Sequence, residues 1–209
     1  DSSYTGESGG EPRNVASPDI NTEDFSAAVD FLIAHPNVDA KRIGIIGICG
    51  FGGMGLNAAA MDTRIKATVA STMYDMSRVN ANGYFDAEDS AEVRRNKREA
   101  MNAIRTRDAQ NGTATPGTPG LPTSIKGDEP QFVKDYFDYY KTERAFHARA
   151  INSNGAWNPT MALSFINMPL LTYIHEIDNA VLLIHGENAH SRYFLSLIHI
   201  SEPTRRRGI

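Results

Sequence analysis

The most constraining feature of this chain is an apolar run that leads directly into a cluster of glycines. Residues 42–48 are almost continuously apolar and lack the alternation of a half-exposed strand. Such a run predicts a strand buried on both faces of a parallel sheet. Gly50, Gly52 and Gly53 follow at once, and residues 54–61 are small, apolar and prone to form a helix. The segment therefore predicts a buried strand, a tight turn and a helix in immediate succession.

The segments on either side extend this pattern. Residues 22–33 carry apolar side chains at helical spacing, and Asn21 is the expected N-cap of that helix. Residues 65–73 and 180–186 have the apolar character of two further buried strands. Helices that alternate with buried strands predict an α/β fold with a doubly wound, mostly parallel sheet.

A long helical stretch interrupts the sheet between residues 80 and 179. Residues 87–109 are highly charged and predict a solvated helix, whereas residues 111–130 are rich in Gly, Thr and Pro and predict a loop. Residues 131–142 and 160–176 carry aromatic, Met and Leu side chains at a spacing typical of two more helices. An insertion of this size commonly carries function.

Cys49 is the single cysteine of the chain and lies on the expected turn. A nucleophile on a sharp strand-to-helix turn is held above the sheet edge, and a helix N-terminus favours the thiolate. The backbone N–H of Gly50 would then face a developing oxyanion. Two alternatives stay open, a buried structural cysteine and a phosphate-binding loop. The loop is disfavoured because no G-x-G-x-x-G pattern falls in phase with the end of the strand and no Lys-Ser/Thr pair follows.

Composition excludes several classes of function. No apolar run approaches the roughly 18–20 residues that cross a bilayer. A formal net charge of −4 gives no electrostatic reason to expect a nucleic acid or an anionic membrane as partner. His185 and His190 are five residues apart at a strand end, which does not fit the helical spacing of a zinc protease. We therefore expect no nucleic acid, no membrane and no metal ion as partner.

Residues 6–13, the helix from Thr22 and residues 47–53 together resemble the α/β-hydrolase superfamily. Within it they are most similar to dienelactone-hydrolase-like and Xaa-Pro-peptidase-like bacterial hydrolases. The resemblance covers residue 1 to about residue 76, and again residues 180–194. It implies a cytoplasmic enzyme with a small-molecule substrate, in which Cys49 replaces the usual serine nucleophile and no cofactor takes part.

The resemblance also implies a division of the chain into four parts. Residues 1–79 would be an incomplete α/β-hydrolase core, residues 80–179 the helical cap, and residues 180–194 a returning core strand with the acid loop. Residues 195–209 resemble the translation of a sequencing adapter, and we expect them to be a non-native tail. The early strands and the last strand–helix pair would then lie outside this chain.

Two positions depart from the family pattern. The usual motif has a glycine two residues after the nucleophile, where this chain has Phe51. The acid is commonly an Asp soon after the strand that ends near His185, but no Asp occupies that place. Glu187 on this loop and Asp75 after the preceding strand are the two candidates for the acid, and both are also compatible with ordinary loop carboxylates.

The general base is the component that the sequence does not supply. On this fold the histidine follows the acid by one strand and one helix, where the expected tail begins. His190 is a weak substitute, and the other histidines have ordinary roles or, for His199, fall in the tail. Aromatic residues of the cap are either an acyl pocket or packing between helices; they are Phe132, Tyr136, Phe137, Tyr139, Tyr140, Phe146 and Trp157.

These observations predict that the parent protein hydrolyses a small ester, lactone or thioester through Cys49. The chain itself would be an inactive fragment of that enzyme. The alternative is a binding or scaffold protein that keeps the fold without catalysis.

Overall fold

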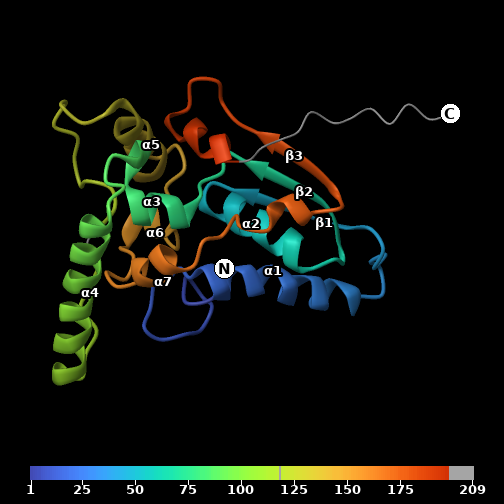
Figure 1. Cartoon of the computed structure of the whole chain (residues 1–209), viewed down its shortest axis with the longest axis horizontal. Helices are drawn as coiled ribbons and strands as arrows, with labels where there is room; N and C mark the ends of the chain where they lie inside the picture. Colours follow the sequence, from blue (N-terminus) through green and yellow to red (C-terminus); the bar gives the residue numbers. More distant parts are fainter. Residues whose placement is uncertain (118, 198–209) are drawn as a thin grey trace.

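The computed structural model describes residues 1–117 and 119–197. Its first half forms a core of helices and strands (Figure 1): α1 (Pro18–Ile33), β1 (Ile43–Ile48), α2 (Gly50–Met61), β2 (Ile65–Ser71), α3 (Met76–Asn82) and the 3₁₀ turn η1 (Tyr84–Asp86). The second half contains α4 (Ala91–Asn111), α5 (Gln131–Lys141), α6 (Ile151–Asn154), α7 (Ala162–Asn167), η2 (Ile174–Glu176), β3 (Ala180–Ile184) and η3 (His190–Leu197). All three predicted strands are therefore confirmed.

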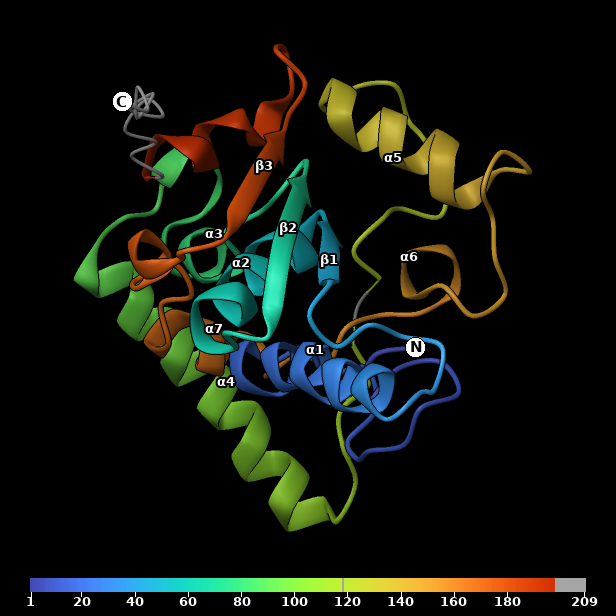
Figure 2. The same ribbon diagram turned by 90° about the vertical axis from the view of Figure 1, so that its right-hand side faces the viewer.

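The strands form one parallel sheet in the order β1-β2-β3, and Figure 2 shows them side by side. In register, Ile46 lies opposite Val69, and Val69 lies opposite Leu182. Parallel pairing directs the carboxyl ends of all three strands to the same edge of the sheet. Residues that follow each strand therefore meet at that edge, and α5 lies beyond it in both views (Figures 1 and 2).

Helices α1 and α2 cover the same face of this sheet. Val29 of α1 and Ala58 of α2 are buried against Ile43 and Ile65 of the strands. The opposite face is open within the described residues, where Ile46 is 68% exposed. The prediction that β1 is buried on both faces is therefore wrong for the described part of the chain, because the helices that pack on β1 lie on one side.

Helix α1 begins earlier than the sequence predicted. Ser17 is its N-cap and Pro18 occupies the first turn, a position that suits proline because it lacks an N–H. Asn21 is buried inside the helix, where its side-chain oxygen accepts a hydrogen bond from the Ser17 N–H at 2.9 Å. Asn21 thus closes the start of the helix from within the first turn rather than as the N-cap.

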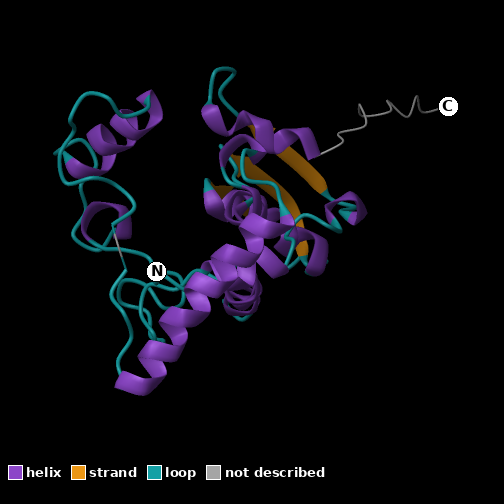
Figure 3. Cartoon of the chain, turned by 60° about the vertical axis from the view of Figure 1, so that its left-hand side comes forward, coloured by secondary structure: helices purple, strands orange, loops and turns teal. Residues whose placement is uncertain are grey.

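Between β2 and β3 the described residues form helices and long loops but no strand (Figure 3). Helix α4 confirms the predicted solvated helix, since Met101 is its one buried residue. The helix predicted over residues 160–176 is wrong in length. It ends at Asn167, because Pro169 cannot continue it, and only the short turn η2 follows. Among the described helices, none is both long and apolar enough to cross a membrane.

The end of the described chain extends the core. Phe194 is fully buried against Leu56 of α2 and Met73 after β2, and Leu195 packs on the edge of this cluster. The predicted non-native tail thus begins within η3, and residues 198–209 of that tail lie outside the described residues.

Candidate active site

Cys49 lies on a sharp turn between β1 and α2. Its backbone has φ 58° and ψ −125°, a conformation that residues other than glycine rarely adopt and that costs about 1–3 kcal/mol. The side chain is exposed at the strand's carboxyl end. This geometry confirms the predicted tight turn, and it argues against a cysteine buried in the core.

Two glycines of α2 allow the helix to approach the end of β2. A β carbon on Gly52 would lie 2.6 Å from the β carbon of Met73, and one on Gly53 would lie 2.4 Å from the carbonyl oxygen of Tyr74. Real β carbons essentially never come this close to other heavy atoms. These positions must therefore be glycine for the turn to close.

The same geometry explains how the chain tolerates Phe51. A β carbon on Gly47 would lie 2.3 Å from the Phe51 carbonyl oxygen. The end of β1 therefore approaches the backbone at position 51 and not the side chain of Phe51. The Phe51 ring packs edge-on against Phe25 of α1, with the ring centroids 6.2 Å apart. A large residue is accommodated here because its side chain points towards α1.

Backbone hydrogen bonds hold the turn from three directions. The Cys49 N–H donates to the Ser71 carbonyl at 3.0 Å. The Cys49 carbonyl accepts from the Gly52 N–H and from the Tyr74 N–H, both at 2.9 Å. The strained conformation is therefore fixed by β2, by α2 and by the segment after β2 together.

Cys49 keeps contact with solvent, but desolvation by its neighbours raises the pKa of its thiol, and the nearby Gly50 N–H lowers it by less. Desolvation therefore opposes the thiolate that the helix N-terminus was expected to favour. Gly50 is the first residue of α2, and the first amides of a helix have no acceptor within it. Its N–H is thus available beside the sulfur to stabilise an oxyanion.

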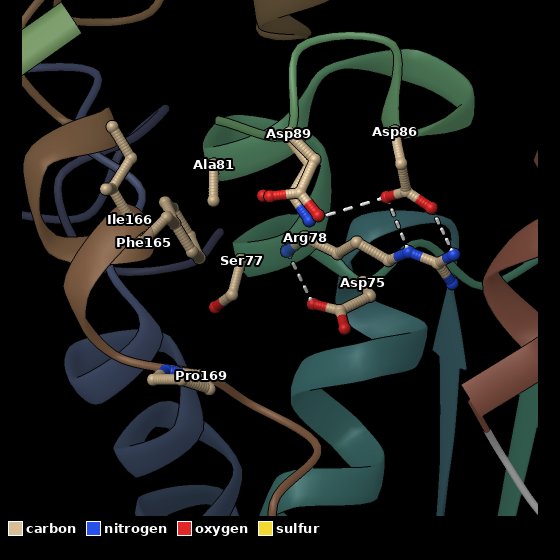
Figure 4. A pocket seen from close by; sticks show the side chains of 10 residues that line it. Asp75, Ser77, Arg78, Ala81, Asp86, Asp89, Phe165, Ile166 and Pro169 are labelled. Atoms are coloured by element: carbon tan, nitrogen blue, oxygen red, sulfur yellow. Dashed lines mark hydrogen bonds and ion pairs between the residues drawn. The ribbon is translucent and has the colours of Figure 1, made fainter. Parts of the chain in front are cut away.

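Asp75 is buried at the start of α3. It caps that helix by accepting a hydrogen bond from the Arg78 N–H at 3.0 Å, and burial raises the pKa of its carboxyl. Asp75 also lines a cavity of about 360 Å³ beside the ion pair of Arg78 with Asp86 (Figure 4). Cys49 is not among the residues that line this cavity.

Glu187 is exposed on the loop after β3. Its backbone carbonyl accepts a hydrogen bond from the Arg192 guanidinium at 3.1 Å. No hydrogen bond within the described residues joins either Glu187 or Asp75 to a histidine ring. The two candidate acids thus sit at the correct edge of the sheet but in separate surroundings.

His190 lies in a group of rings that we call the aromatic cluster, formed by Tyr74, Tyr84, Phe132, Tyr136 and His190. The His190 ring stacks on Phe132 with centroids 4.2 Å apart, and its Nε2 is hydrogen-bonded to the Tyr74 hydroxyl. The Tyr74 hydroxyl also lies 3.1 Å from the Tyr136 hydroxyl. Burial lowers the pKa of His190, so the neutral imidazole is favoured.

The aromatic cluster is joined to the Cys49 turn through Tyr74, whose N–H donates to the Cys49 carbonyl at 2.9 Å. Burial raises the pKa of Tyr84, Tyr136 and Tyr140. Sequence reasoning named the three tyrosines of α5 but missed Tyr74 and Tyr84. The available signal for Tyr74 was its place just after β2, at the sheet edge where ligands commonly bind.

The two histidines near β3 are engaged separately. His185 Nε2 lies 3.0 Å from the Ser191 hydroxyl, whereas His190 faces Tyr74. Across residues 1–117 and 119–197, no group of three or more His, Cys, Asp or Glu side chains is arranged to hold a metal ion.

Several known proteins are similar to this chain over different parts of its length. Residues 20–115 match the family model described as BAAT / Acyl-CoA thioester hydrolase C terminal. The chain is 59% identical over 195 residues to the uncharacterized protein PA2218 of Pseudomonas aeruginosa, which covers 93% of this chain and 52% of that protein. It is 43% identical over 65 residues to the thiohydrolase apmlB of Arthrinium phaeospermum, across 31% of this chain and 21% of that one. The chain thus spans about half the length of PA2218.

Two solved structures are similar to this chain. The crystal structure of PA2218 superposes with a TM-score of 0.87 at 58% identity, over 94% of this chain and 60% of that chain. The α/β hydrolase GrgF from Penicillium superposes with a TM-score of 0.66 at 20% identity, over 91% of this chain and 61% of that chain. The described parallel sheet, its strand–turn–helix at Cys49 and these superpositions agree that the chain has the α/β-hydrolase fold.

Proposed function

We propose that the whole protein is a hydrolase that cleaves a thioester, or a related small ester or lactone, through nucleophilic attack by Cys49. The observation that carries this proposal is the strained turn at Cys49, with φ 58°, an exposed thiol and a Gly50 amide beside the sulfur. Strain of this kind persists where surrounding structure fixes it, and it is concentrated at functional sites. The fold alone does not define a reaction, so the site has to carry the argument.

Among the three bonds, the thioester has the strongest support. The matched family model is described as an acyl-CoA thioester hydrolase, and the relative from Arthrinium is named a thiohydrolase. A thiol nucleophile also suits this substrate, because attack on a thioester exchanges one carbon–sulfur bond for another. The first step is therefore close to balanced in energy.

The proposed reaction has two halves. The sulfur of Cys49 forms a bond to the carbonyl carbon, and the Gly50 N–H stabilises the oxyanion of the tetrahedral intermediate. The bond to the leaving thiol then breaks, the thiol takes up a proton, and the acyl group remains on Cys49. Water attacks this acyl-enzyme in the second half and releases the acid together with the free Cys49 thiol.

Because burial raises the pKa of Cys49, a base has to remove its proton. We propose a histidine supplied after residue 194 for this role, with Glu187 or Asp75 as the carboxylate that orients it. A cysteine depends less on such a base than a serine does, because it is intrinsically more nucleophilic. A nucleophilic thiol stays reduced in a reducing compartment, which favours the cytoplasm.

Acylation of the single cysteine tests the proposal directly. The protein is incubated with a short acyl thioester of N-acetylcysteamine, quenched in acid and measured by intact mass spectrometry. We expect one acyl group on the wild-type chain, located at Cys49 by peptide mapping, and none on Cys49→Ala. Cys49→Ser is the matched control that keeps the shape of the side chain.

Two results would contradict the proposal. A wild-type chain that stays unmodified while a small free thiol is acylated in parallel would favour the binding or scaffold alternative. Equal acylation of the wild type and Cys49→Ala would show that another group reacts. Circular dichroism of both variants establishes that the comparison is between folded chains.

A further inference from the structure

Helix α5 presents a stripe of aromatic side chains to the core. Phe132, Tyr136 and Tyr140 are spaced four residues apart, which places them on one face of the helix. Their rings contact one another edge-on, with centroid distances of 6.2 Å for the first pair and 6.3 Å for the second. The stripe is therefore a continuous aromatic surface along α5.

This stripe faces the sheet edge that holds the nucleophile. The Tyr136 hydroxyl is 3.1 Å from the Tyr74 hydroxyl, and the Tyr74 N–H donates to the Cys49 carbonyl at 2.9 Å. Phe132 lies 5.5 Å from Tyr84, measured between ring centroids. Figures 1 and 2 agree with these contacts, because α5 lies beyond the carboxyl ends of the strands in both.

Part of the aromatic surface remains open beside the thiol. Tyr84 is 39% exposed, Tyr136 and Tyr140 are half-buried, and Cys49 itself is exposed. The contacts from the Cys49 carbonyl through Tyr74 to Tyr136 place the stripe next to the Cys49 turn. A group bonded to the carbonyl under attack would therefore meet ring edges and faces.

We propose that the acyl group of the substrate carries an aromatic ring, which packs against Tyr84, Tyr136 and Tyr140 when its carbonyl reaches Cys49. This inference rests on the proposed function and narrows its substrate class. Aromatic rings prefer edge-to-face and offset contacts with other rings, and such contacts stabilise beyond the apolar area they bury. A saturated ring of similar size would bury the area but lack this additional attraction.

The acyl side is the half of the substrate that such a surface serves best. The acyl group stays within a few bonds of the Cys49 sulfur during the attack and in the acyl-enzyme, whereas the leaving thiol departs after the first half. Contacts with rings around the sulfur therefore persist along the reaction only for the acyl group. They favour the transition state that leads to acylation.

A matched pair of thioesters tests this preference. The 3-phenylpropionyl and 3-cyclohexylpropionyl thioesters of N-acetylcysteamine have the same linker to the carbonyl and differ in whether the ring is aromatic. The acylation rate of Cys49 is measured by intact mass and divided by the rate for free N-acetylcysteine. We expect the phenyl compound to react at least about fivefold faster after this correction, as one or more aromatic contacts would give.

Three variants assign the preference to the stripe. Tyr140→Leu should lower the ratio towards one, whereas Tyr140→Phe keeps the ring and should keep the ratio. Tyr173→Leu is the control, because Tyr173 is an exposed aromatic residue beside η2, 62% exposed. Acetyl thioesters of benzyl thiol and of cyclohexylmethyl thiol test whether the aromatic preference lies with the leaving thiol instead.

The outcomes separate this inference from the proposed function. Failure of every thioester to acylate Cys49 would contradict the proposed function itself. Acylation without a phenyl preference, or with a preference confined to the leaving thiol, would overturn the aromatic acyl group and leave the nucleophile intact. A preference that Tyr140→Leu does not reduce would also overturn it, provided that the variant is folded by circular dichroism.

Discussion

The backbone N–H of Tyr74 donates a hydrogen bond to the carbonyl of Cys49 at 2.9 Å. The same residue contacts Tyr136 of α5 through its hydroxyl, at 3.1 Å. Tyr74 therefore links the Cys49 turn to helix α5.

Gly52→Ala should destabilise the protein through a collision at the turn. The added β carbon would lie 2.6 Å from the β carbon of Met73, which is fully buried and cannot move aside. Overpacking of this kind costs about 1–3 kcal/mol. The free energy of unfolding in urea, and the acylation of Cys49, should both fall relative to the wild type.

Gly55→Ala is the matched control on the same helix. Its new β carbon would lie 3.6 Å from its nearest neighbours, an ordinary contact distance, and alanine favours a helix interior over glycine by about 0.5–1 kcal/mol. This variant should equal or exceed the wild type in stability. If Gly52→Ala and Gly55→Ala behaved alike, the close approach of α2 to the end of β2 would not be what fixes the turn.

The sequence predicted the turn at Cys49 because its signal is local. An apolar strand, a run of glycines and a helix-forming segment are adjacent in the chain, so periodicity and residue size were sufficient to locate the turn. The same local signal did not show why Phe51 is tolerated. That depends on the direction of its side chain towards Phe25, which is a tertiary contact.

The surroundings of the site were harder to predict because they come from distant segments. Tyr74, Tyr84 and His190 meet α5 across more than 45 residues of sequence, and no pattern within one segment indicates that meeting. The balance of charge effects at Cys49 was hard to predict for a related reason. The favourable field at a helix N-terminus can be anticipated from sequence, whereas desolvation of Cys49 depends on what packs around it.

Alkylation of Cys49 should have a pH midpoint above that of an ordinary thiol, about 8.5. Burial raises the pKa of Cys49 in the folded chain, so the reactive thiolate forms only at higher pH. The rate of iodoacetamide labelling is measured against pH for the native chain and for the same chain unfolded in urea. The native midpoint should be the higher of the two, and a lower native midpoint would show that the Gly50 amide dominates over burial.

Stability should decrease as the pH falls below about 6.5, the usual pKa of histidine. Burial lowers the pKa of His190, and His185 lowers it further while Asp135 opposes them, so the folded chain binds a proton less readily than the unfolded chain. The stabilisation is therefore complete above the unfolded pKa and is lost as the pH falls towards the folded pKa.

His190→Gln tests this assignment, since an amide can still bond the Tyr74 hydroxyl but does not titrate. Its urea midpoint should change less between pH 7.5 and pH 5.5 than that of the wild type. His175→Gln, a change at an exposed ring, is the control. An unchanged pH dependence in His190→Gln would assign the effect to other groups, of which His185 is the first to examine, because burial lowers its pKa as well.

The link between Tyr74 and α5 should appear as an energetic coupling between two phenols. Tyr74→Phe and Tyr136→Phe each remove one partner of the same hydrogen bond while keeping the ring, so removing the second hydroxyl costs less once the first is gone. A double-mutant cycle on the free energy of unfolding should therefore give a coupling of about 0.5–1.5 kcal/mol.

Tyr139→Phe replaces Tyr136→Phe in a control cycle, because Tyr139 is 46% exposed and its hydroxyl does not contact Tyr74 in the described structure. Additive effects in the first cycle would mean that α5 is held to the core by ring packing alone. In that case Tyr74 would fix the turn at Cys49 without transmitting the position of the helix to it.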